Sequence, residues 1–213
     1  QYDTYQTFSA VALLSQRAKD KGTSAYLASE YNFSNSYFDA PQRFKRFNAV
    51  GKCNSKLGTN NLFNAAISTF SSSWNHSGQI PDRSVNAGDI SFFGAIDDTE
   101  GGKTSRTNVN LKLTMPNSKG LMTHQVFYSN YNFELFSNFT FFLNDPIHGD
   151  QIKQKENRNI LGYNGSYTTE TKLGKWPLRS TAGINYRQDF IQNNELSHTK
   201  NHTELLEAHM LGN

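Results

Sequence analysis

The sequence predicts an all-β fold, and more narrowly an antiparallel transmembrane β-barrel segment of about eight up-and-down strands with short periplasmic turns and long extracellular loops. The stretch RTNVNLKLTM (106–115) alternates apolar and polar residues, which is the period of a strand with one apolar and one wet face. The 213-residue chain is rich in Phe (16) and Tyr (10), which favour strands. Short and long connections also alternate along the chain.

The first four strands are expected at 4–14, 23–33, 43–53 and 61–73. Segment 43–53 alternates least regularly. In the other three, the residues that recur on one face are Phe8, Ala10, Ala12 and Leu14, then Ala25, Leu27, Tyr31 and Phe33, then Phe63, Ala65, Ile67 and Thr69. Their neighbours in the chain are mostly polar or small, which predicts strands with two unlike faces.

The last four strands are expected at 106–115, 121–135, 158–169 and 177–189. Their recurring residues are Thr107, Val109, Leu111 and Leu113, then Phe127, Tyr131, Phe133 and Leu135, then Leu161, Tyr163 and Tyr167, then Leu178, Ala182, Ile184 and Tyr186. Most of the eight segments are close to the roughly 9–11 residues that a tilted strand needs to cross a bilayer. They are longer than the usual strand of about 5–6 residues.

The connections between these segments differ in length by parity. Four are short and polar: SQRAKDKG, NSKLGTN, PNSKG and TKLGKW. The alternate connections are longer, at 34–42, 74–105, 136–157 and 190 to the end, where LSHTKNHTELLEAHMLGN is expected to form a loop with a helical turn. Transmembrane barrels have short turns on one side and long loops on the other, whereas a Greek-key sandwich has no reason to sort loops in this way.

Composition excludes several other classes. No apolar run reaches the roughly 18 residues of a membrane-spanning helix, and QYDTYQTFSA does not open the chain as a signal peptide does. The single Cys53 rules out an intrachain disulfide framework and a cysteine zinc cluster. The net charge is only +3, and the basic clusters QRFKRF and KQKENR are short, so no nucleic-acid partner is expected.

Loop motifs carry a resemblance to a known family. The stretches SGQIPDR, FGAIDDTEGGKTSR, SNFTFFLNDPIHGDQI and ELSHTKNHTELLE, and more weakly YFDAPQRFKRFNAVGK, run over nearly the whole chain. With the strands between them, they resemble the middle of the barrel of TonB-dependent outer-membrane receptors.

The resemblance implies a plugged barrel of about 22 strands in the bacterial outer membrane. Such a receptor takes up a scarce small-molecule or oligosaccharide substrate, such as siderophore-bound iron, cobalamin or a glycan, and is driven by a TonB-type energy-transducing protein. No plug domain, N-terminal coupling motif or aromatic-ended terminal strand is recognised, so 1–213 is expected to be a partial barrel domain. We expect a transporter segment in contact with the lipid bilayer, not an enzyme, and no cofactor.

Ligand-binding residues are expected in the two longest loops, 74–105 and 136–157. The polar candidates there are Arg83, Asp97, Asp98, Glu100, Arg106 and His148. The acidic group in GAIDDTEGGKTSR could bind calcium, but its spacing is not that of an EF-hand. Pairing of these carboxylates with Arg106 or Arg83, which would hold the loop together, is the favoured interpretation.

Two further sets of side chains have a chemical and a structural interpretation. His198 and His202, four apart, could share a helix face and bind zinc with Glu195 or Glu204, but we expect a solvated or loop-packing pair and no metal. Asp145 and Asp150 could be the paired carboxylates of a glycosidase. Their places in NDPIHGD indicate ordinary turn chemistry instead.

The apolar stretch Phe139–Leu143 also has two interpretations. A strand extension with aromatic residues at the outer interface is favoured over a hydrophobic lid above the substrate mouth. For the whole chain, two alternatives stay open. One is a self-contained eight-strand barrel with a structural or adhesion role, whose narrow interior would be filled by side chains; the other is a soluble carbohydrate-binding β domain.

Overall fold

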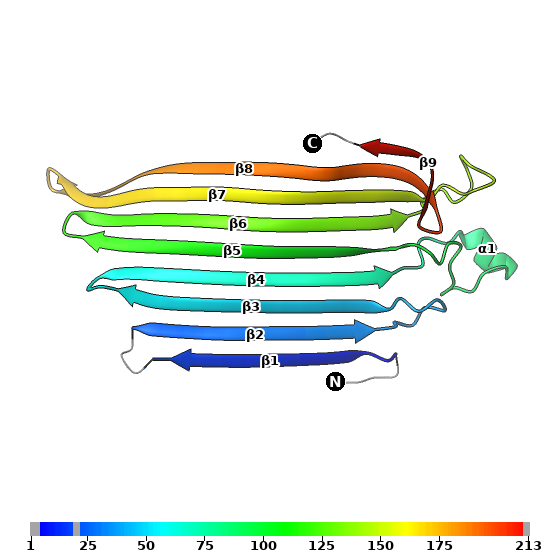
Figure 1. Cartoon of the computed structure of the whole chain (residues 1–213), viewed down its shortest axis with the longest axis horizontal. Coiled ribbons are helices and arrows are strands. Elements are labelled where there is room, and N and C mark those ends of the chain that lie inside the picture. Colours follow the sequence, from blue (N-terminus) through cyan, green and yellow to red (C-terminus); the bar gives the residue numbers. More distant parts are fainter. Residues whose placement is uncertain (1–4, 19–21, 211–213) are drawn as a thin grey trace.

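The computed structural model is one antiparallel sheet. It describes residues 5–18 and 22–210, with the backbone alone for 204–210. The strands are β1 (Phe8–Arg17), β2 (Thr23–Ser34), β3 (Phe44–Leu57), β4 (Asn61–Asn75), β5 (Gly101–Asn117), β6 (Gly120–Ser137), β7 (Ile152–Leu173), β8 (Trp176–Lys200) and β9 (Thr203–Met210), and the helix is α1 (Asp82–Ala87). Their order in the sheet is their order in the chain (Figure 1).

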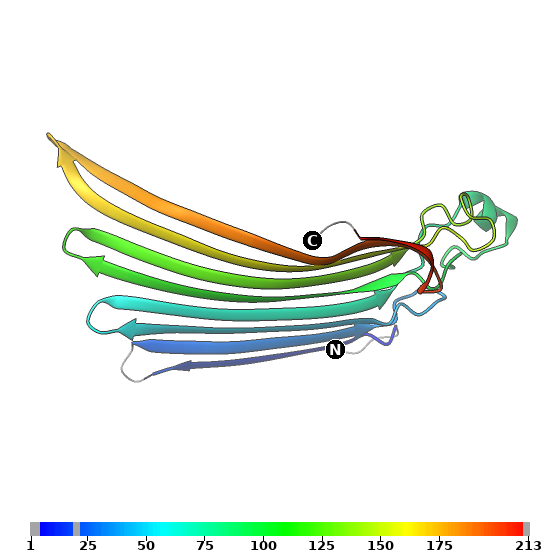
Figure 2. The same ribbon diagram turned by 45° about the horizontal axis from the view of Figure 1, so that its top comes forward.

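The all-β prediction and the eight up-and-down strands are therefore confirmed. Among the described residues β1 pairs only with β2 and β9 only with β8, so the sheet is open and no barrel is closed. The sheet is strongly curved, and β7 and β8 rise away from the other strands at the end where the tight turns lie (Figure 2). No helix in the described part of the chain is long and apolar enough to cross a membrane.

The expected loop at the C-terminal end is wrong. Strand β8 continues to Lys200, a two-residue turn at 201–202 follows, and 203–210 return as β9 against β8. The sequence TELLEAHM favours a helix by composition, but pairing with a neighbouring strand overrides this local preference. The alternation of short and long connections consequently holds for the first seven connections and fails at the eighth.

Several strands are also longer than the sequence predicted. Strands β5, β7 and β8 have 17, 22 and 25 residues. The long loops shrink accordingly to 76–100 and 138–151, and they gather at one end of the sheet with α1 (Figure 1). The tight turns lie at the opposite end, apart from the turn at 201–202, which lies with the long loops.

Cross-strand pairing places the expected apolar residues on one face of the sheet. Because directly paired residues point to the same side, the row that pairs Ile67 with Val109 and Val109 with Tyr128 lies on one face. We call this side the apolar face; its exposed large residues include Leu14, Leu27, Ile67, Leu111, Val126, Leu161, Ile184 and Tyr186. The opposite side, the polar face, carries Glu30, Asn48, Arg106 and Asn108.

The residues predicted to recur in the sixth strand do share a face, but it is the polar one. Phe127 pairs with Asn110, and Tyr131 pairs with Arg106. The ring of Phe127 covers Gly162, where an added Cβ would overlap it. An aromatic residue packed over a glycine on the neighbouring strand fixes the register of the two strands.

The sheet has almost no hydrophobic core. Phe136, at 8% exposure, is the one buried hydrophobic side chain in the part of the chain whose side chains are described, whereas Leu14 and Ile184 remain 68% and 65% exposed. A domain normally buries its apolar faces between two layers, and this single layer does not. The apolar face therefore needs to be covered by something other than the described part of this chain.

On β6 and β7 the apolar face ends below the long loops, whereas on β2 and β3 Tyr31 and Phe47 continue it in the same cross-strand row. Beyond Tyr128 and Leu161 the same face carries Asn130, Asn132 and Asn157. Asn130 Nδ2 donates to Asn159 Oδ1 at 2.8 Å, and Asn132 Nδ2 donates to Asn130 Oδ1 at 2.7 Å. Amides that bond to one another can face water, whereas isolated amides are costly in an apolar medium. This asparagine ladder marks the boundary of the apolar band on these two strands.

Candidate functional site

Three chain segments meet at the loop end of the sheet. Loop 76–100 leaves β4, loop 138–151 leaves β6, and the turn at 201–202 joins β8 to β9. His76 N donates to Glu100 O at 3.1 Å, which closes the first loop at its base. Thr199 N donates to Gln151 O at 2.7 Å, which ties the end of the second loop to β8.

Asp97 is the main acceptor of this junction. Its Oδ1 accepts hydrogen bonds from Thr99 N (3.0 Å) and Thr99 Oγ1 (2.5 Å), and its Oδ2 accepts from Asn138 Nδ2 (3.1 Å) and Gln151 Nε2 (2.9 Å). Burial works to raise its pKa, but these hydrogen bonds outweigh that effect and hold the pKa below its usual range. Both carboxylate oxygens are therefore satisfied by the protein itself.

Gln151 connects Asp97 to the end of β8. The side chain is 2% exposed, and its Nε2 also donates to Thr99 Oγ1 at 2.8 Å. Its Oε1 accepts from Thr199 Oγ1 and from His202 N, each at 3.1 Å. All hydrogen-bonding positions of this amide are used within three segments of the chain.

Glu100 is buried as deeply but is only half satisfied. Its Oε2 accepts from Asn138 N at 2.9 Å, whereas its Oε1 is buried with no hydrogen-bond partner, as is the hydroxyl of Ser77. Burial and the charge of Asp97 raise the pKa of Glu100 to about 7, against the opposing effect of the Asn138 N–H. His76 Nε2 lies 3.7 Å from Glu100 Oε2, and burial lowers the pKa of His76.

The two histidines of the expected zinc pair lie in strand β8 and the following turn, not on a helix. The Nε2 atoms of His198 and His202 lie within hydrogen-bond distance of the carbonyls of Gly149 and Thr99, and the ring of His202 stacks on Phe136 with centroids 4.1 Å apart. This is the loop-packing role that we expected. Within the described residues, no group of three or more His, Cys, Asp or Glu is placed to hold a metal ion.

Of the six candidate ligand residues, the structure brings together only Asp97 and Glu100. Asp98 and Arg83 are exposed. Arg106 lies on the polar face, where its Nε donates to Asn108 Oδ1 at 3.0 Å and to Ser129 Oγ at 3.1 Å. The expected pairing of the acidic group with Arg83 or Arg106 is therefore wrong: amides and hydroxyls, not guanidinium groups, hold the loop.

His148 lies in the outer part of loop 138–151, where two aspartates form turns. Asp145 Oδ1 accepts from the backbone N of Ile147 and of His148, each at 2.9 Å, and Asp150 Oδ1 accepts from Asp145 N at 2.7 Å. Turn chemistry is confirmed for both aspartates. The hydrogen bonds from His148 and Ile147 lower the pKa of Asp145 to about 2, against a smaller effect of burial.

The stretch Phe139–Leu143 is not a strand extension, because β6 ends at Ser137. Phe139, Phe142 and Leu143 are exposed in the loop itself. A second group of rings lies on the neighbouring loops, where Tyr37 stacks on Phe38 with centroids 4.7 Å apart and meets Phe93 edge-on at 5.3 Å. The long-loop end thus presents aromatic side chains outside a polar centre.

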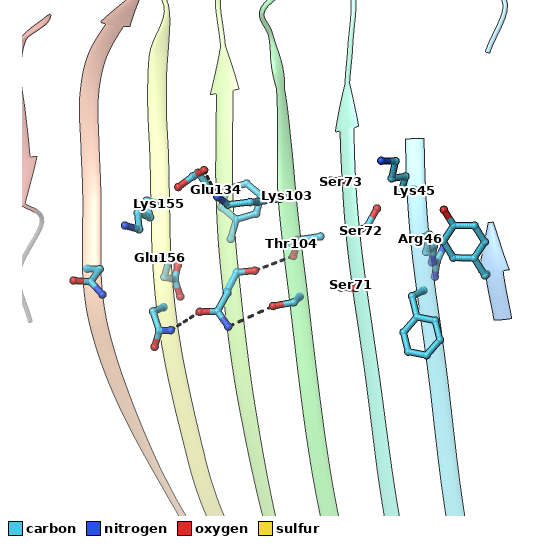
Figure 3. A pocket seen from close by; sticks show the side chains of 17 residues that line it. Lys45, Arg46, Ser71, Ser72, Ser73, Lys103, Thr104, Glu134, Lys155 and Glu156 are labelled. Atoms are coloured by element: carbon cyan, nitrogen blue, oxygen red, sulfur yellow. Dashed lines mark hydrogen bonds and ion pairs between the residues drawn. The ribbon is translucent and has the colours of Figure 1, made fainter. Parts of the chain in front are cut away.

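Two cavities lie close to this end. One of about 600 Å³ lies on the sheet, where Figure 3 shows Lys45 on β3, Lys103 on β5, Glu134 on β6, and Lys155 and Glu156 on β7. Lys103 Nζ lies 2.8 Å from Glu134 Oε1, and Glu156 is paired with Arg158 at 2.6 Å. The other, of about 320 Å³, lies among the loops and is lined by Phe38, His76, Ser77, Glu100, Asn138 and Phe139, among others.

Sequence reasoning missed four residues of the junction: His76, Ser77, Asn138 and Gln151. Asn138 and Gln151 are 41 and 54 residues from Asp97 along the chain, so no local spacing could reveal them. Only the position of these four residues could have indicated their role. Each lies next to the loop end of a strand in the same sheet as β5. No family model, no curated protein and no solved structure matches this chain.

Proposed function

We propose that this chain forms part of the membrane wall and the outer loops of a TonB-dependent type of outer-membrane receptor, which takes up a scarce nutrient. The observation that carries the proposal is the apolar face: a nine-stranded sheet exposes large aliphatic and aromatic side chains with almost no protein core beneath them. Lipid is the covering that such a face requires.

Three further features support a membrane orientation. On β6 and β7 the asparagine ladder ends the apolar band on the side of the long loops, as expected where strands leave the lipid. Trp176 is 77% exposed beside the tight turn at the other end, and tryptophan is enriched at membrane interfaces. Long loops at one end and tight turns at the other match the layout of outer-membrane barrels.

The receptor role rests on the sequence resemblance together with the loop end. The loops hold a polar centre and a cavity at the side that would face the outside of the cell. The substrate would be bound there, and the energy for uptake would come from an inner-membrane partner acting on a plug domain. A soluble carbohydrate-binding domain is disfavoured because its sheet would have to bury the apolar face against a second layer.

Cys53 offers a direct test of the membrane orientation. It is the single cysteine of the chain and lies on the apolar face, paired with Ala25 and Ala65. In outer-membrane fractions we expect a water-soluble maleimide to leave Cys53 unlabelled, because lipid keeps the reagent away from the thiol. The matched control moves the thiol by one residue to the polar face, as Lys52→Cys in a Cys53→Ser background, and should be labelled.

Labelling of both positions before detergent is added would contradict a lipid-facing sheet. An immunoblot of the same fractions, boiled and unboiled, separates the remaining alternatives. A folded band several times larger than the 24.1 kDa of this chain is expected for a receptor. A heat-shifted band near 24 kDa would instead identify a self-contained small barrel and contradict the receptor proposal.

A further inference from the structure

A row of charged side chains crosses the sheet just beyond the asparagine ladder. Direct cross-strand pairing joins Lys45 to Ser73, Ser73 to Lys103, Lys103 to Glu134 and Glu134 to Lys155. Directly paired residues point to the same side of a sheet, so these five side chains lie on one face. Figure 3 shows them along the cavity of about 600 Å³, on strands β3 to β7.

This row continues the apolar face toward the long loops. Side chains along a strand alternate between the two faces. Lys45 lies two residues from Phe47, and Lys103 lies six residues from Val109, so both lysines share the face of these apolar side chains. The next row toward the tight turns pairs Phe47 with Tyr31, and both rings are exposed. Lysines at the rim of an apolar band can lay their alkyl stems on it and hold their charges at its edge.

The carboxylates that line the cavity do not neutralise its lysines. Glu134 is paired with Lys103 at 2.8 Å, and Glu156 is paired with an arginine at 2.6 Å. Among the described side chains, Lys45 and Lys155 take part in no ion pair. The cavity therefore carries more positive than negative charge.

Small side chains leave space between two of the lysines. Ser73 on β4 lies between Lys45 on β3 and Lys103 on β5, and all three side chains are exposed. Two strand spacings, about 10 Å, separate the lysine backbones, so the long side chains can bring both ammonium groups to one anion above Ser73. Each ammonium group has three donors, so Lys103 can keep its contact with Glu134 and still bind the anion.

The arrangement matches a lipid headgroup better than a free anion. Along β3 the ring of Phe47 is followed on the same face by the charge of Lys45, which is the order in which a lipid presents its acyl chains and its phosphate. A free anion would make no use of the exposed rings of Phe47 and Tyr31. Lysine binds phosphate as a point charge, and basic groups at a membrane surface attract anionic lipids.

We infer that this cavity binds the phosphate group of an anionic membrane lipid, with the ammonium groups of Lys45 and Lys103 and the hydroxyl of Ser73 as donors. The glycerol end of the acyl chains would lie against Phe47 and Tyr31. The inference deepens the proposed function and rests on its membrane orientation, since the cavity borders lipid only if the apolar face does.

The test uses the full protein, purified from outer membranes in a non-ionic detergent and shown to be folded by its heat-shifted migration. The probe is dioleoylphosphatidylglycerol, and dioleoylphosphatidylcholine is its zwitterionic counterpart with the same acyl chains. Native mass spectrometry measures how much of each lipid is bound at increasing concentrations. We expect phosphatidylglycerol to bind at least about tenfold more tightly, because each lysine near an anionic headgroup contributes about 1 kcal/mol and 1.4 kcal/mol is a factor of ten.

Lys45→Gln should weaken phosphatidylglycerol binding about fivefold, the factor that corresponds to about 1 kcal/mol. Lys45→Arg keeps the charge and should retain the affinity. The control Lys112→Gln removes the same charge from an exposed position on the polar face of β5 and should leave lipid binding unchanged.

Three results would each overturn this inference: equal affinity for the two lipids, an affinity that Lys45→Gln leaves unchanged, or an equal loss of affinity in Lys112→Gln. Displacement of the lipid by inorganic phosphate, but not by sodium chloride of equal ionic strength, would overturn it as well and identify a site for free phosphate. The proposed function would survive all of these results, since it fails on the maleimide and immunoblot outcomes instead.

Discussion

The strand region and the loop end of this molecule distribute polarity in opposite ways. On the apolar face Leu14 and Ile67 keep 68% and 53% of their surface exposed, whereas at the loop end Glu100, Gln151 and Thr199 keep 2% or less. Among the side chains that the structure describes, seven of the eight buried polar ones lie at or beyond the loop ends of the strands, and Ser129 is the exception. The molecule thus exposes apolar groups in one region and buries polar groups in the other.

This difference indicates two different surroundings. In water, the apolar face would give up the hydrophobic stabilisation that normally drives folding, and the sheet would keep little beyond its backbone hydrogen bonds. Under the proposed membrane orientation, the same face is compatible with the lipid around it. The loop end, which would lie in water, is then the part that needs internal order. A polar centre held by hydrogen bonds can order long loops without a large hydrophobic core.

The largest expected effect tests the strand region, where apolar side chains are exposed. Leu111→Lys places a charge in the middle of the apolar band on β5, and we expect it to destabilise the folded, heat-shifted form by about 2–4 kcal/mol in a bilayer. The matched control Asn110→Lys puts the same charge on the polar face, one residue away, and should have little effect. Urea titration of the heat-shifted band measures both. Equal tolerance of the two substitutions would mean that water, not lipid, covers the apolar face.

The second effect concerns the dependence of stability on pH. Folding raises the pKa of Glu100 from its ordinary 4.5 to about 7, so the folded chain keeps a proton that the unfolded chain loses. The stabilising contribution of Glu100 is therefore complete below about pH 4.5, declines as the pH rises and is lost above about pH 7, for a total of up to about 3 kcal/mol.

Glu100→Gln should remove this decline and make the chain more stable than the wild type at pH 8. The other titratable groups at the junction are His76 and Asp97 in the same loop and His202, whose ring contacts the neighbouring Thr99 carbonyl. They remain in the variant, so the difference between the two proteins isolates Glu100. Unfolding in urea at pH 5 and pH 8 measures the difference in stability between the two proteins. A variant less stable than the wild type at pH 8 would contradict the conclusion that the Glu100 carboxylate is unsatisfied.

The strands could be predicted from the sequence because each carries its own alternating pattern. The ends could not. Strand β5 begins at Gly101, not at Arg106 as predicted. The stretch GGKTS has no apolar face from which a strand could be predicted, and it pairs only because β4 and β6 extend beside it. Strand β9 has no such pattern, and only its pairing with β8 makes it a strand.

The loop end was predictable only in part. The sequence singled out Asp97 and Glu100 as a cluster, but it assigned them arginine partners, because charge pairing is what a sequence makes visible. The actual partners are neutral amides and a backbone N–H from loop 138–151. Finding them requires the register of β5, β6 and β7, which brings residues 97, 138 and 151 to one place.

The third effect tests the loop end, where polar side chains are buried. Asp97→Asn replaces one accepting oxygen by an NH₂ group that faces the donors of Thr99, Asn138 or Gln151, so at least one buried donor loses its acceptor. We expect a loss of about 2 kcal/mol, expressed as faster protease cleavage within loops 76–100 and 138–151 while the strands stay protected. Because Glu100→Gln is expected to stabilise the chain at pH 8, opposite results for two carboxylates three residues apart would sharpen the contrast between them. Unchanged cleavage in Asp97→Asn would contradict the role of Asp97 as the main acceptor.

The smallest effect lies at the tip of loop 138–151, outside the polar centre. Asp145→Ala removes the acceptor of the Ile147 and His148 amides, and we expect faster hydrogen exchange at these two amides, with no measurable change in global unfolding. The reason is exposure: Ile147 is 76% exposed, so water can replace the lost acceptor, and Asp150 still accepts from the amides of Asn144 and Asp145. If Asp145→Ala instead exposed loop 76–100 to protease as Asp97→Asn does, the tip would belong to the polar centre. The boundary between a water-exposed tip and a buried junction would then lie farther out than Asn138 and Gln151.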